Sequence, residues 1–370
     1  MYRIFPLTRI TTFLCLVVLS GILAAGLWPF HAPRNAVRWL PDADGLYFDR
    51  YGSVISAGRI PDEPEETYSL EVWVQPAARK PSATILGFCA PETLHSFHLA
   101  QIHDDLVLEG DAVREENRVR ISWIEIPHAF RLNAPLLITV TSGKYTAVYL
   151  DGVLAKTAQF RFVRSGLAGQ LVLGTSPAVD QGWVGKLRGL AFYDRELTPE
   201  EVTLHHLSWM GKGPRITGAT HLYRFDERSG DRVHDASNPG IDLRIPPRYT
   251  ILKPPFLESP VKAFRNNWSY WKDVLINIGG FIPFGFLFGI YFSLMRPTPR
   301  PKLTTILCGA AVSLLIEITQ VFLPTRDSSM TDVLMNTLGT TLGVLLQSCT
   351  PAWSLYRRIL MPASNRRGSV

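Results

Sequence analysis

The sequence predicts a multidomain chain with two unlike folds: an antiparallel β-sandwich, or jelly roll, and an α-helical transmembrane domain. The middle of the chain contains short runs of alternating apolar and polar residues, separated by turn signals. The two ends contain apolar runs long enough to cross a membrane, one at 10–30 and three at about 273–295, 303–323 and 331–349. We therefore expect four transmembrane helices in all.

Composition narrows the class of protein. The chain has 370 residues, which leaves room for two or three domains. Its net charge of +6 does not indicate a nucleic-acid partner, because the arginines lie beside the apolar runs rather than on one basic face. Cys15, Cys308 and Cys349 lie in or next to those runs, so Cys89 is alone in the middle of the chain. An internal disulfide is impossible there, and no cysteine spacing typical of zinc occurs.

The first apolar run has two interpretations. Residues 1–9 form a short basic segment, expected in the cytoplasm, and residues 10–30 form a transmembrane anchor or a signal peptide. Ala24 and Ala25 are small residues at which a signal peptidase could cut. The run is slightly long for a signal peptide, which favours the anchor. Under both interpretations the segment that follows is carried across the membrane.

Residues 43–244 are expected to form the sandwich. Alternating runs typical of strands recur at 69–75, 137–142, 145–150 and 170–174. Asp151 and Gly152 stand between two such runs and favour the positive φ angles of a tight hairpin. One short helix is expected after Thr198, which with Glu201 has the pattern of a capping box.

Four segments of this region carry a resemblance: EVWVQP, VYLDGVLAKT, LVLGTS and WVGKLRGLAFYDRELTPEEV. In this order they resemble the laminin-G-like, concanavalin A-type sandwich family over about residues 43–260. Arg188 and Gly189 replace an Asp-Glu pair usual in that family. Residues 222–243 resemble the opening strand and turn of such domains and are expected to add a last strand. The resemblance implies a domain that binds glycan or protein.

Some relatives of this fold are glycosidases, which need two carboxylates about 5 Å apart in the retaining case. No Glu-x-Asp-x-x-Glu pattern occurs in this sequence. Glu71 is followed at alternate positions by Trp73 and Gln75, so its strand offers no second acid. We therefore expect no glycan cleavage.

Two groups of residues in the sandwich raise the question of a metal. The histidines are expected to be ordinary surface or core residues, because two of them would face opposite sides of one strand: His95, His98 and His103. Three acids are able to hold calcium, although acidic loops are usually solvated: Asp104, Asp105 and Asp111. Calcium is the one cofactor left open.

The C-terminal part is expected to be a proline-rich extended linker at 245–262, a membrane domain at 263–350 and a basic cytoplasmic tail at 351–370. Basic residues in the loop 296–302 and in the tail place both in the cytoplasm by the positive-inside rule. The sandwich and the loop 324–330 are then outside. We expect a multi-pass membrane protein with its sandwich on the non-cytoplasmic side.

Polar residues inside the predicted spans lie on single helix faces. They form pairs three or four residues apart: Asp273 with Asn277, Glu317 with Gln320, and Asp332 with Asn336. Asn277, Glu317 and Asn336 each lie about 9–10 Å from the expected end of a helix. We expect these six residues to converge in one binding site near the outer surface, with Arg326 reaching back from its loop toward the acids. Gly339 and Gly343 predict a close helix–helix contact.

The same residues carry a second resemblance. Three motifs resemble the VanZ-like membrane family over about residues 262–350: D-x-x-x-N-x-x-x-F-x-P-x-G from Asp273, I-E-x-x-Q-x-F from Ile316, and R-x-x-x-x-x-D-x-x-x-N-x-x-G from Arg326. The family is named for a protein linked to tolerance of the lipoglycopeptide teicoplanin. The resemblance implies a helical membrane domain in a bacterial inner membrane, which would place the sandwich in the periplasm or extracellular space, but it assigns no molecular activity.

Three hypotheses on function follow. In the first, the membrane domain binds an envelope lipid or amphiphile and the sandwich binds cell-wall glycan or an envelope protein. In the second, the membrane domain is an enzyme on a lipid-linked or phosphate-bearing substrate, with Glu317 or Asp332 as acid or base and Arg326 on the phosphate. In the third, the chain is a scaffold or sensor, and the polar residues only hold the helices together.

Overall fold

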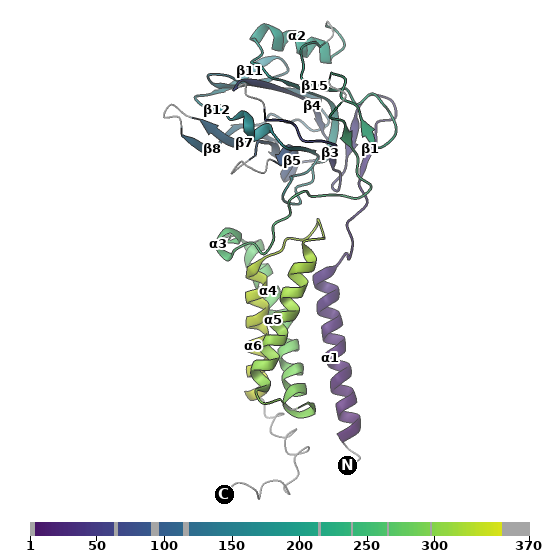
Figure 1. Cartoon of the computed structure of the whole chain (residues 1–370), viewed down its shortest axis with the longest axis vertical. Coiled ribbons are helices and arrows are strands. Elements are labelled where there is room, and N and C mark those ends of the chain that lie inside the picture. Colours follow the sequence, from purple (N-terminus) through teal and green to yellow (C-terminus); the bar gives the residue numbers. More distant parts are fainter. Residues whose placement is uncertain are drawn as a thin grey trace, which may run out of the picture. The chain divides into compact units, whose positions relative to one another are not determined.

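The computed structural model describes residues 4–62, 66–89, 96–113, 118–213, 216–237, 240–264, 266–296 and 298–349. Residues 32–254 form one compact unit, and the segments before and after them form a second. The first unit consists mainly of strands and the second of helices, as Figure 1 shows. The predicted combination of a sandwich with a helical domain is therefore confirmed.

Within the described residues the first sheet has eight strands. Across the sheet they are β1 (Val37–Trp39), β2 (Leu46–Phe48), β14 (Gly185–Tyr193), β4 (Tyr68–Pro76), β9 (Leu136–Ser142), β10 (Thr146–Leu150) and β11 (Val153–Ala158), with β15 (His221–Tyr223) beside β14. Every pairing in this sheet is antiparallel. The predicted strands at 69–75, 137–142 and 145–150 are thus confirmed as β4, β9 and β10.

The second sheet has nine strands within the described residues. They are β12 (Arg161–Phe162), β7 (Asp105–Val113), β6 (His98–His103), β5 (Lys80–Cys89), β13 (Gln170–Leu173), β3 (Val54–Ser56), β17 (Leu243–Arg244) and β16 (Arg232–Val233), with β8 (Val119–Ile126) beside β7. A 3₁₀ turn, η1 (Arg164–Leu167), precedes β13. The segment 222–243 supplies strands to both sheets rather than one.

The hairpin between β10 and β11 shows why the local sequence matters. Asp151 and Gly152 have φ angles of 50° and 81°, so both turn residues are in the left-handed region that the Asp-Gly pair tolerates. The Asp151 carboxylate also accepts a hydrogen bond from the backbone N–H of Leu137 at 2.9 Å. The turn therefore fixes the register of three neighbouring strands.

The core lies between the two sheets, because each strand buries the side chains of one face. Phe88 from the second sheet meets Phe192 from the first edge to face, with ring centroids 5.9 Å apart. Each such aromatic side chain contributes about 1.5–3 kcal/mol by its burial. The alternating pattern read from the sequence is the pattern of this burial.

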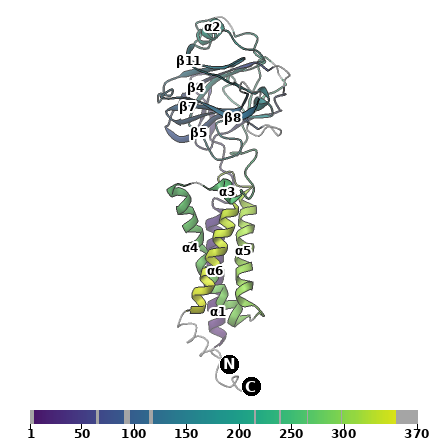
Figure 2. The ribbon, with the colours of Figure 1, turned by 90° about the vertical axis from the view of Figure 1, so that its left-hand side faces the viewer.

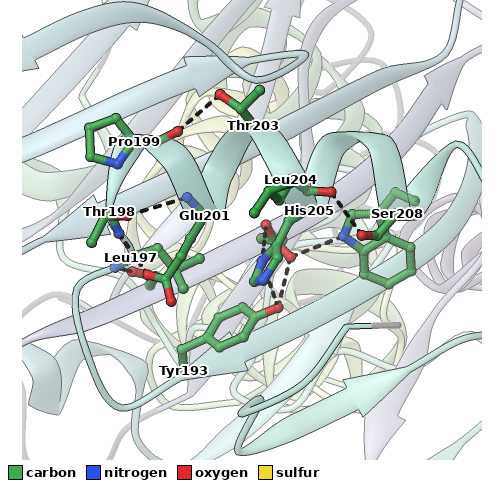
Figure 3. A network of polar contacts seen from close by, with 12 residues as sticks. Tyr193, Leu197, Thr198, Pro199, Glu201, Thr203, Leu204, His205 and Ser208 are labelled. Atoms are coloured by element: carbon green, nitrogen blue, oxygen red, sulfur yellow. Dashed lines mark hydrogen bonds and ion pairs between the residues drawn. The ribbon is translucent and has the colours of Figure 1, made fainter. Parts of the chain in front are cut away.

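Helix α2 (Pro199–Trp209) covers the outer face of the first sheet. It begins with the predicted capping box: the Thr198 hydroxyl accepts from the Glu201 N–H, and the Glu201 carboxylate accepts from the Thr198 N–H. Val202 and Trp209 face the sheet and are buried against it. Figure 3 shows the start of this helix and its polar contacts.

The predicted extended linker at 245–262 is wrong in its first half. Tyr249 is 1% exposed, and its hydroxyl is 2.8 Å from the Asp180 carboxylate and 2.6 Å from the Thr175 hydroxyl. Ile251 is buried as well. The prolines suggested a spacer, but the apolar residues between them find partners on the sandwich, which extends to residue 254.

The second unit contains helices α1 (Ile4–Leu27), α3 (Pro260–Ala263), α4 (Trp268–Ile290), α5 (Pro301–Gln320) and α6 (Met330–Cys349), with a π-helical turn η2 (Tyr291–Met295) after α4. The four long helices lie side by side in Figures 1 and 2. Within the described residues three stretches are long and apolar enough to span a membrane: Thr8–Leu27, Trp268–Leu294 and Pro301–Gln320. Four spans were predicted and three are candidates by length and hydropathy. The predicted span without a candidate is α6, because its polar residues lower its mean hydropathy.

Glycines bring α4 and α6 into close contact. A Cβ on Gly339 or Gly343 would collide with the backbone carbonyl oxygens of Ile278 or Ile282, and a Cβ on Gly285 with that of Thr340. Such contacts are possible only because the side chains are absent. The predicted contact surface at Gly339 and Gly343 is confirmed.

Candidate functional site

A cavity of about 600 Å³ lies in the helical unit, at the end of the bundle where α1 and α5 finish and α4 and α6 begin. The structure brings all seven residues proposed from the sequence to its wall: Asp273, Asn277, Glu317, Gln320, Arg326, Asp332 and Asn336. Alternating helix directions explain the convergence. The last turn of one helix and the first turn of the next share one depth.

Glu317 is 2% exposed and is held by the loop that follows its own helix. Its carboxylate accepts the backbone N–H of Ser329 at 2.8 Å. The loop itself is tied to the segment before α3, since the carbonyl of Ser328 accepts from the Glu258 N–H at 3.0 Å and the carbonyl of Glu258 accepts from the Met330 N–H at 3.0 Å. This two-stranded contact fixes the rim of the cavity.

Arg326 does not make the contact expected from the sequence. Instead of reaching an acid, its guanidinium donates to the carbonyl oxygens of Trp28, at 2.9 Å, and of Ala25, at 3.2 Å. The C-terminal turn of a helix leaves carbonyl groups without intrahelical donors and carries partial negative charge. Those carbonyls at the end of α1 take two of the five N–H groups of Arg326, so the side chain is directed at α1 rather than at Glu317 or Asp332.

Sequence reasoning missed the contribution of α1 to the cavity. Gln320 donates through its amide nitrogen to the carbonyl of Gly26 at 2.8 Å, and a Cβ on Gly26 would press against Ile316 at 2.9 Å. Residues of α1 therefore form one wall of the cavity. The small residues that suggested a cleavage site, together with Gly26, permit this close approach. No local motif signals it.

Several buried polar atoms at the wall have no hydrogen-bond partner among the described residues: Gln320 Oε1, Asn336 Oδ1, Thr325 Oγ1 and Thr331 Oγ1. Asn336 donates through its amide nitrogen to the Ser313 hydroxyl at 2.8 Å, and Asn277 hydrogen-bonds the Asp332 carboxylate. Buried polar atoms are rarely left unpaired in proteins. The cavity is thus rimmed by groups whose hydrogen-bonding capacity is only partly used.

Two family matches agree with this architecture. Residues 49–203 match the concanavalin A-like lectin/glucanases superfamily, and residues 223–350 match VanZ/LLP1. The chain joins a concanavalin A-like domain to a VanZ-like domain. Both resemblances read from the sequence are confirmed, and with the candidate spans they make the chain a membrane protein. The VanZ match includes α4, α5 and α6 but not α1.

Solved structures of low similarity also match. A Bacteroides ovatus protein assigned as carbohydrate-binding is 13% identical with a TM-score of 0.39, covering 54% of this chain and 57% of that one. The receptor-binding domain of botulinum neurotoxin D is 14% identical with a TM-score of 0.33, covering 46% and 47%. A heptameric SAP-like pentraxin from Limulus polyphemus is 15% identical with a TM-score of 0.35, covering 58% and 93%. No curated protein matches the chain.

In the concanavalin A-like domain Glu71 is inaccessible to substrate, since it is 0% exposed and lies between the first sheet and α2. Its carboxylate accepts from the Tyr193 hydroxyl at 2.9 Å and from the Trp209 indole N–H at 3.0 Å, and it is 3.1 Å from His205 Nδ1. Figure 3 shows Tyr193 and His205 side by side in this network. Burial and the neighbouring carboxylate raise the pKa of Tyr193, so its hydroxyl stays protonated and donates.

The predicted metal ligands are scattered. Asp104 and Asp105 lie with His128 in one group of possible ligands at the surface, whereas Asp111 is buried in β7. A hydrogen bond from His128 lowers the pKa of the Asp104 carboxyl. His98 lies 3.6 Å from Glu109, and His103 is exposed at the end of β6 with a φ of 56°. His95 lies outside the described residues, and the expectation of no cofactor, with calcium left open, stays untested.

Proposed function

We propose that this chain is a cell-envelope membrane protein whose VanZ-like domain binds the polar head group of an amphiphile in the cavity at the end of the bundle. One observation carries the proposal: acids and amides from α4, α5 and α6 surround a volume of about 600 Å³ instead of filling it with their own contacts. Cavities of about 300–1,000 Å³ are the size at which proteins bind small molecules. A purely structural polar network would close on itself.

The enzyme hypothesis has less support. Glu317 and Asp332 both line the cavity and are able to exchange protons, but no histidine, cysteine or lysine stands among the described lining residues. The Ser328 hydroxyl hydrogen-bonds the Glu317 carboxylate, but no histidine orients this pair as in a Ser-His-Asp triad. Binding without turnover is the function that this set of groups favours.

A pair of neighbouring glycines allows a direct test. Gly280 lines the cavity and Gly279 does not, and a Cβ on either would meet no atom within 4 Å. Gly280→Leu should fill the cavity without disturbing the helix, while Gly279→Leu is the matched control. Full-length protein purified in a nonionic detergent is examined by native mass spectrometry for co-purifying amphiphile.

We expect a bound mass on the wild type and on Gly279→Leu, and none on Gly280→Leu. Equal bound mass on all three proteins, or none on the wild type after mild extraction, would contradict binding in the cavity. Thermal unfolding in the same detergent shows whether both variants are folded.

Glycan binding is a second candidate function, and it concerns the outward face of the second sheet. His98, Glu109 and Trp123 lie directly opposite one another on β6, β7 and β8, while their chain neighbours Leu108 and Ile124 face the core. Trp123 is 65% exposed. An exposed indole beside hydrogen-bonding groups offers a flat apolar surface and polar partners, which suits a sugar ring.

Trp123→Ala should remove binding of the full chain to a panel of cell-wall glycans. The control is Val153→Ala, which truncates an equally exposed apolar residue on β11. Unchanged binding by the Trp123 variant would exclude this surface. A protein ligand for the sandwich would be indicated by capture of an envelope protein with no glycan signal.

We also propose the orientation expected from the sequence, with the loop around Arg300 in the cytoplasm and the sandwich outside. Arg300 is exposed between η2 and α5. In a variant whose four native cysteines are serine, Arg300→Cys should react only with a membrane-permeant reagent in intact cells. Labelling by an impermeant reagent would show that the loop around Arg300 lies outside, opposite to the proposed orientation.

A link to glycopeptide tolerance is tested separately, by teicoplanin susceptibility of a strain that lacks the gene.

A further inference from the structure

The hydrogen-bonding groups at the cavity wall are mostly acceptors. Gln320 and Asn336 are 7% and 5% exposed, and each has an amide oxygen without a partner among the described residues. Carboxylates add only acceptors when ionised. A ligand that satisfies this wall must therefore donate hydrogen bonds.

The orientation of the Gln320 amide follows from its partner. The carbonyl of Gly26 only accepts, so the amide nitrogen of Gln320 must face it, and the oxygen is left buried without a partner among the described residues. Thr331, at 5% exposed, contributes a hydroxyl that has no partner either.

The charged residues at the cavity wall also favour a positively charged ligand. Five acids line the cavity: Glu258, Asp273, Glu317, Asp327 and Asp332. Among the described lining residues Arg326 is the one base, and its guanidinium is bound to the carbonyls at the end of α1. The electrostatic potential of such a cavity attracts a cation and repels a phosphate.

We propose that the cavity binds an amphiphile whose head group carries an ammonium, a conclusion that rests on the proposed function of this site. An ammonium has three hydrogen-bond donors, no acceptor and a positive charge, and so complements the acids that line the cavity. The apolar part of the ligand lies against apolar lining residues such as Ile22, Ile276 and Phe281. A phosphate group carries negative charge and acceptors, so the same acids repel it.

The test compares three single-chain probes with the same alkyl chain: dodecylammonium, dodecyl phosphate and dodecyl glucoside. Binding to the full-length protein in a nonionic detergent is measured by titration calorimetry below the critical micelle concentration of each probe. We expect saturable binding of dodecylammonium at least about ten-fold tighter than that of either other probe. Glu317→Gln and Asp332→Asn should each reduce this preference by about ten-fold, and the surface variant Asp62→Asn should not.

The outcomes separate the two levels of the proposal. Tightest binding of dodecyl phosphate or dodecyl glucoside, lost in Gly280→Leu, would overturn the ammonium inference and leave the head-group site standing. Absence of saturable binding by all three probes would overturn both. The comparison of probes on the wild type needs no variant, so it holds even where a substitution of Glu317 prevents folding.

Discussion

The two units each bury a glutamate, and the comparison shows that burial alone does not mark a functional site. Glu71 is 0% exposed and Glu317 is 2% exposed. Glu71 is surrounded by side-chain donors from Tyr193, Trp209 and His205, which use its acceptor capacity. Glu317 accepts from the Ser329 N–H and from the Ser328 hydroxyl, and it borders a cavity.

The difference lies in what surrounds each carboxylate. Around Glu71 the donors come from a packed cluster between α2 and the first sheet, so the network stabilises the fold. Around Glu317 the remaining polar atoms face a volume that the chain itself does not fill. We infer that a bordering cavity, rather than burial, distinguishes the proposed binding site from the structural network.

The largest expected effect tests the structural side of this comparison. Glu71→Ala leaves the Tyr193 hydroxyl, the Trp209 indole N–H and His205 without their acceptor, which should lower the free energy of unfolding by about 3–5 kcal/mol. Calorimetry of the full chain should show a lower Tm for the sandwich. The exposed Asp62→Ala is the control, with an expected change within about 0.5 kcal/mol. A Tm equal to the wild type would mean that the network contributes nothing to stability.

The next effect concerns the scaffold that holds the cavity. Gly343→Ala places a methyl group against the carbonyl of Ile282 and should force α4 and α6 apart, at a cost of about 1–3 kcal/mol. Gly279→Ala meets no atom within 4 Å and should be neutral or slightly stabilising. Thermal unfolding in detergent compares the two. Similar Tm values for both variants would show that α4 and α6 leave room for a methyl group at Gly343.

Glu317→Gln tests whether the second buried glutamate contributes to binding rather than to stability. Glutamine keeps the shape of the side chain and an oxygen that accepts from the Ser329 N–H, and its amide group borders the cavity. The stability of the bundle should change by less than about 1 kcal/mol, while the preference for dodecylammonium falls by about ten-fold. A drop in Tm as large as that of Glu71→Ala would assign Glu317 to a structural network.

The smallest effect is a pH dependence at the start of α2. Two hydrogen bonds from Arg195 and one from the Thr198 N–H lower the pKa of Glu201 from 4.5 to about 2. Because the folded pKa is the lower one, this contribution to stability is present above pH 4.5 and is lost as the pH falls toward 2. Glu201→Gln should flatten the fall in Tm over this range. An unchanged pH profile would contradict it.

The features that could be predicted from the sequence depend on residues close to one another along the chain. Alternation in β4 and β9, the Asp151-Gly152 turn and the capping box at Thr198 each involve residues close in sequence, and each is found as expected. The polar pairs of α4, α5 and α6 were predictable for the same reason. A helix fixes which face a residue takes, and alternating helices bring their ends together.

The contacts that decide the chemistry join distant residues. Arg326 and Trp28 are 298 positions apart, Gln320 and Gly26 are 294 apart, and Trp209 and Glu71 are 138 apart. The sequence by itself determined the elements, the two folds and the residues at the site, because local periodicity and turn chemistry act within a few residues. Only the tertiary structure decided that α1 forms a wall of the cavity, that Arg326 is occupied and that Glu71 is satisfied. Which donor meets which acceptor depends on packing between elements, and no spacing in the sequence encodes it.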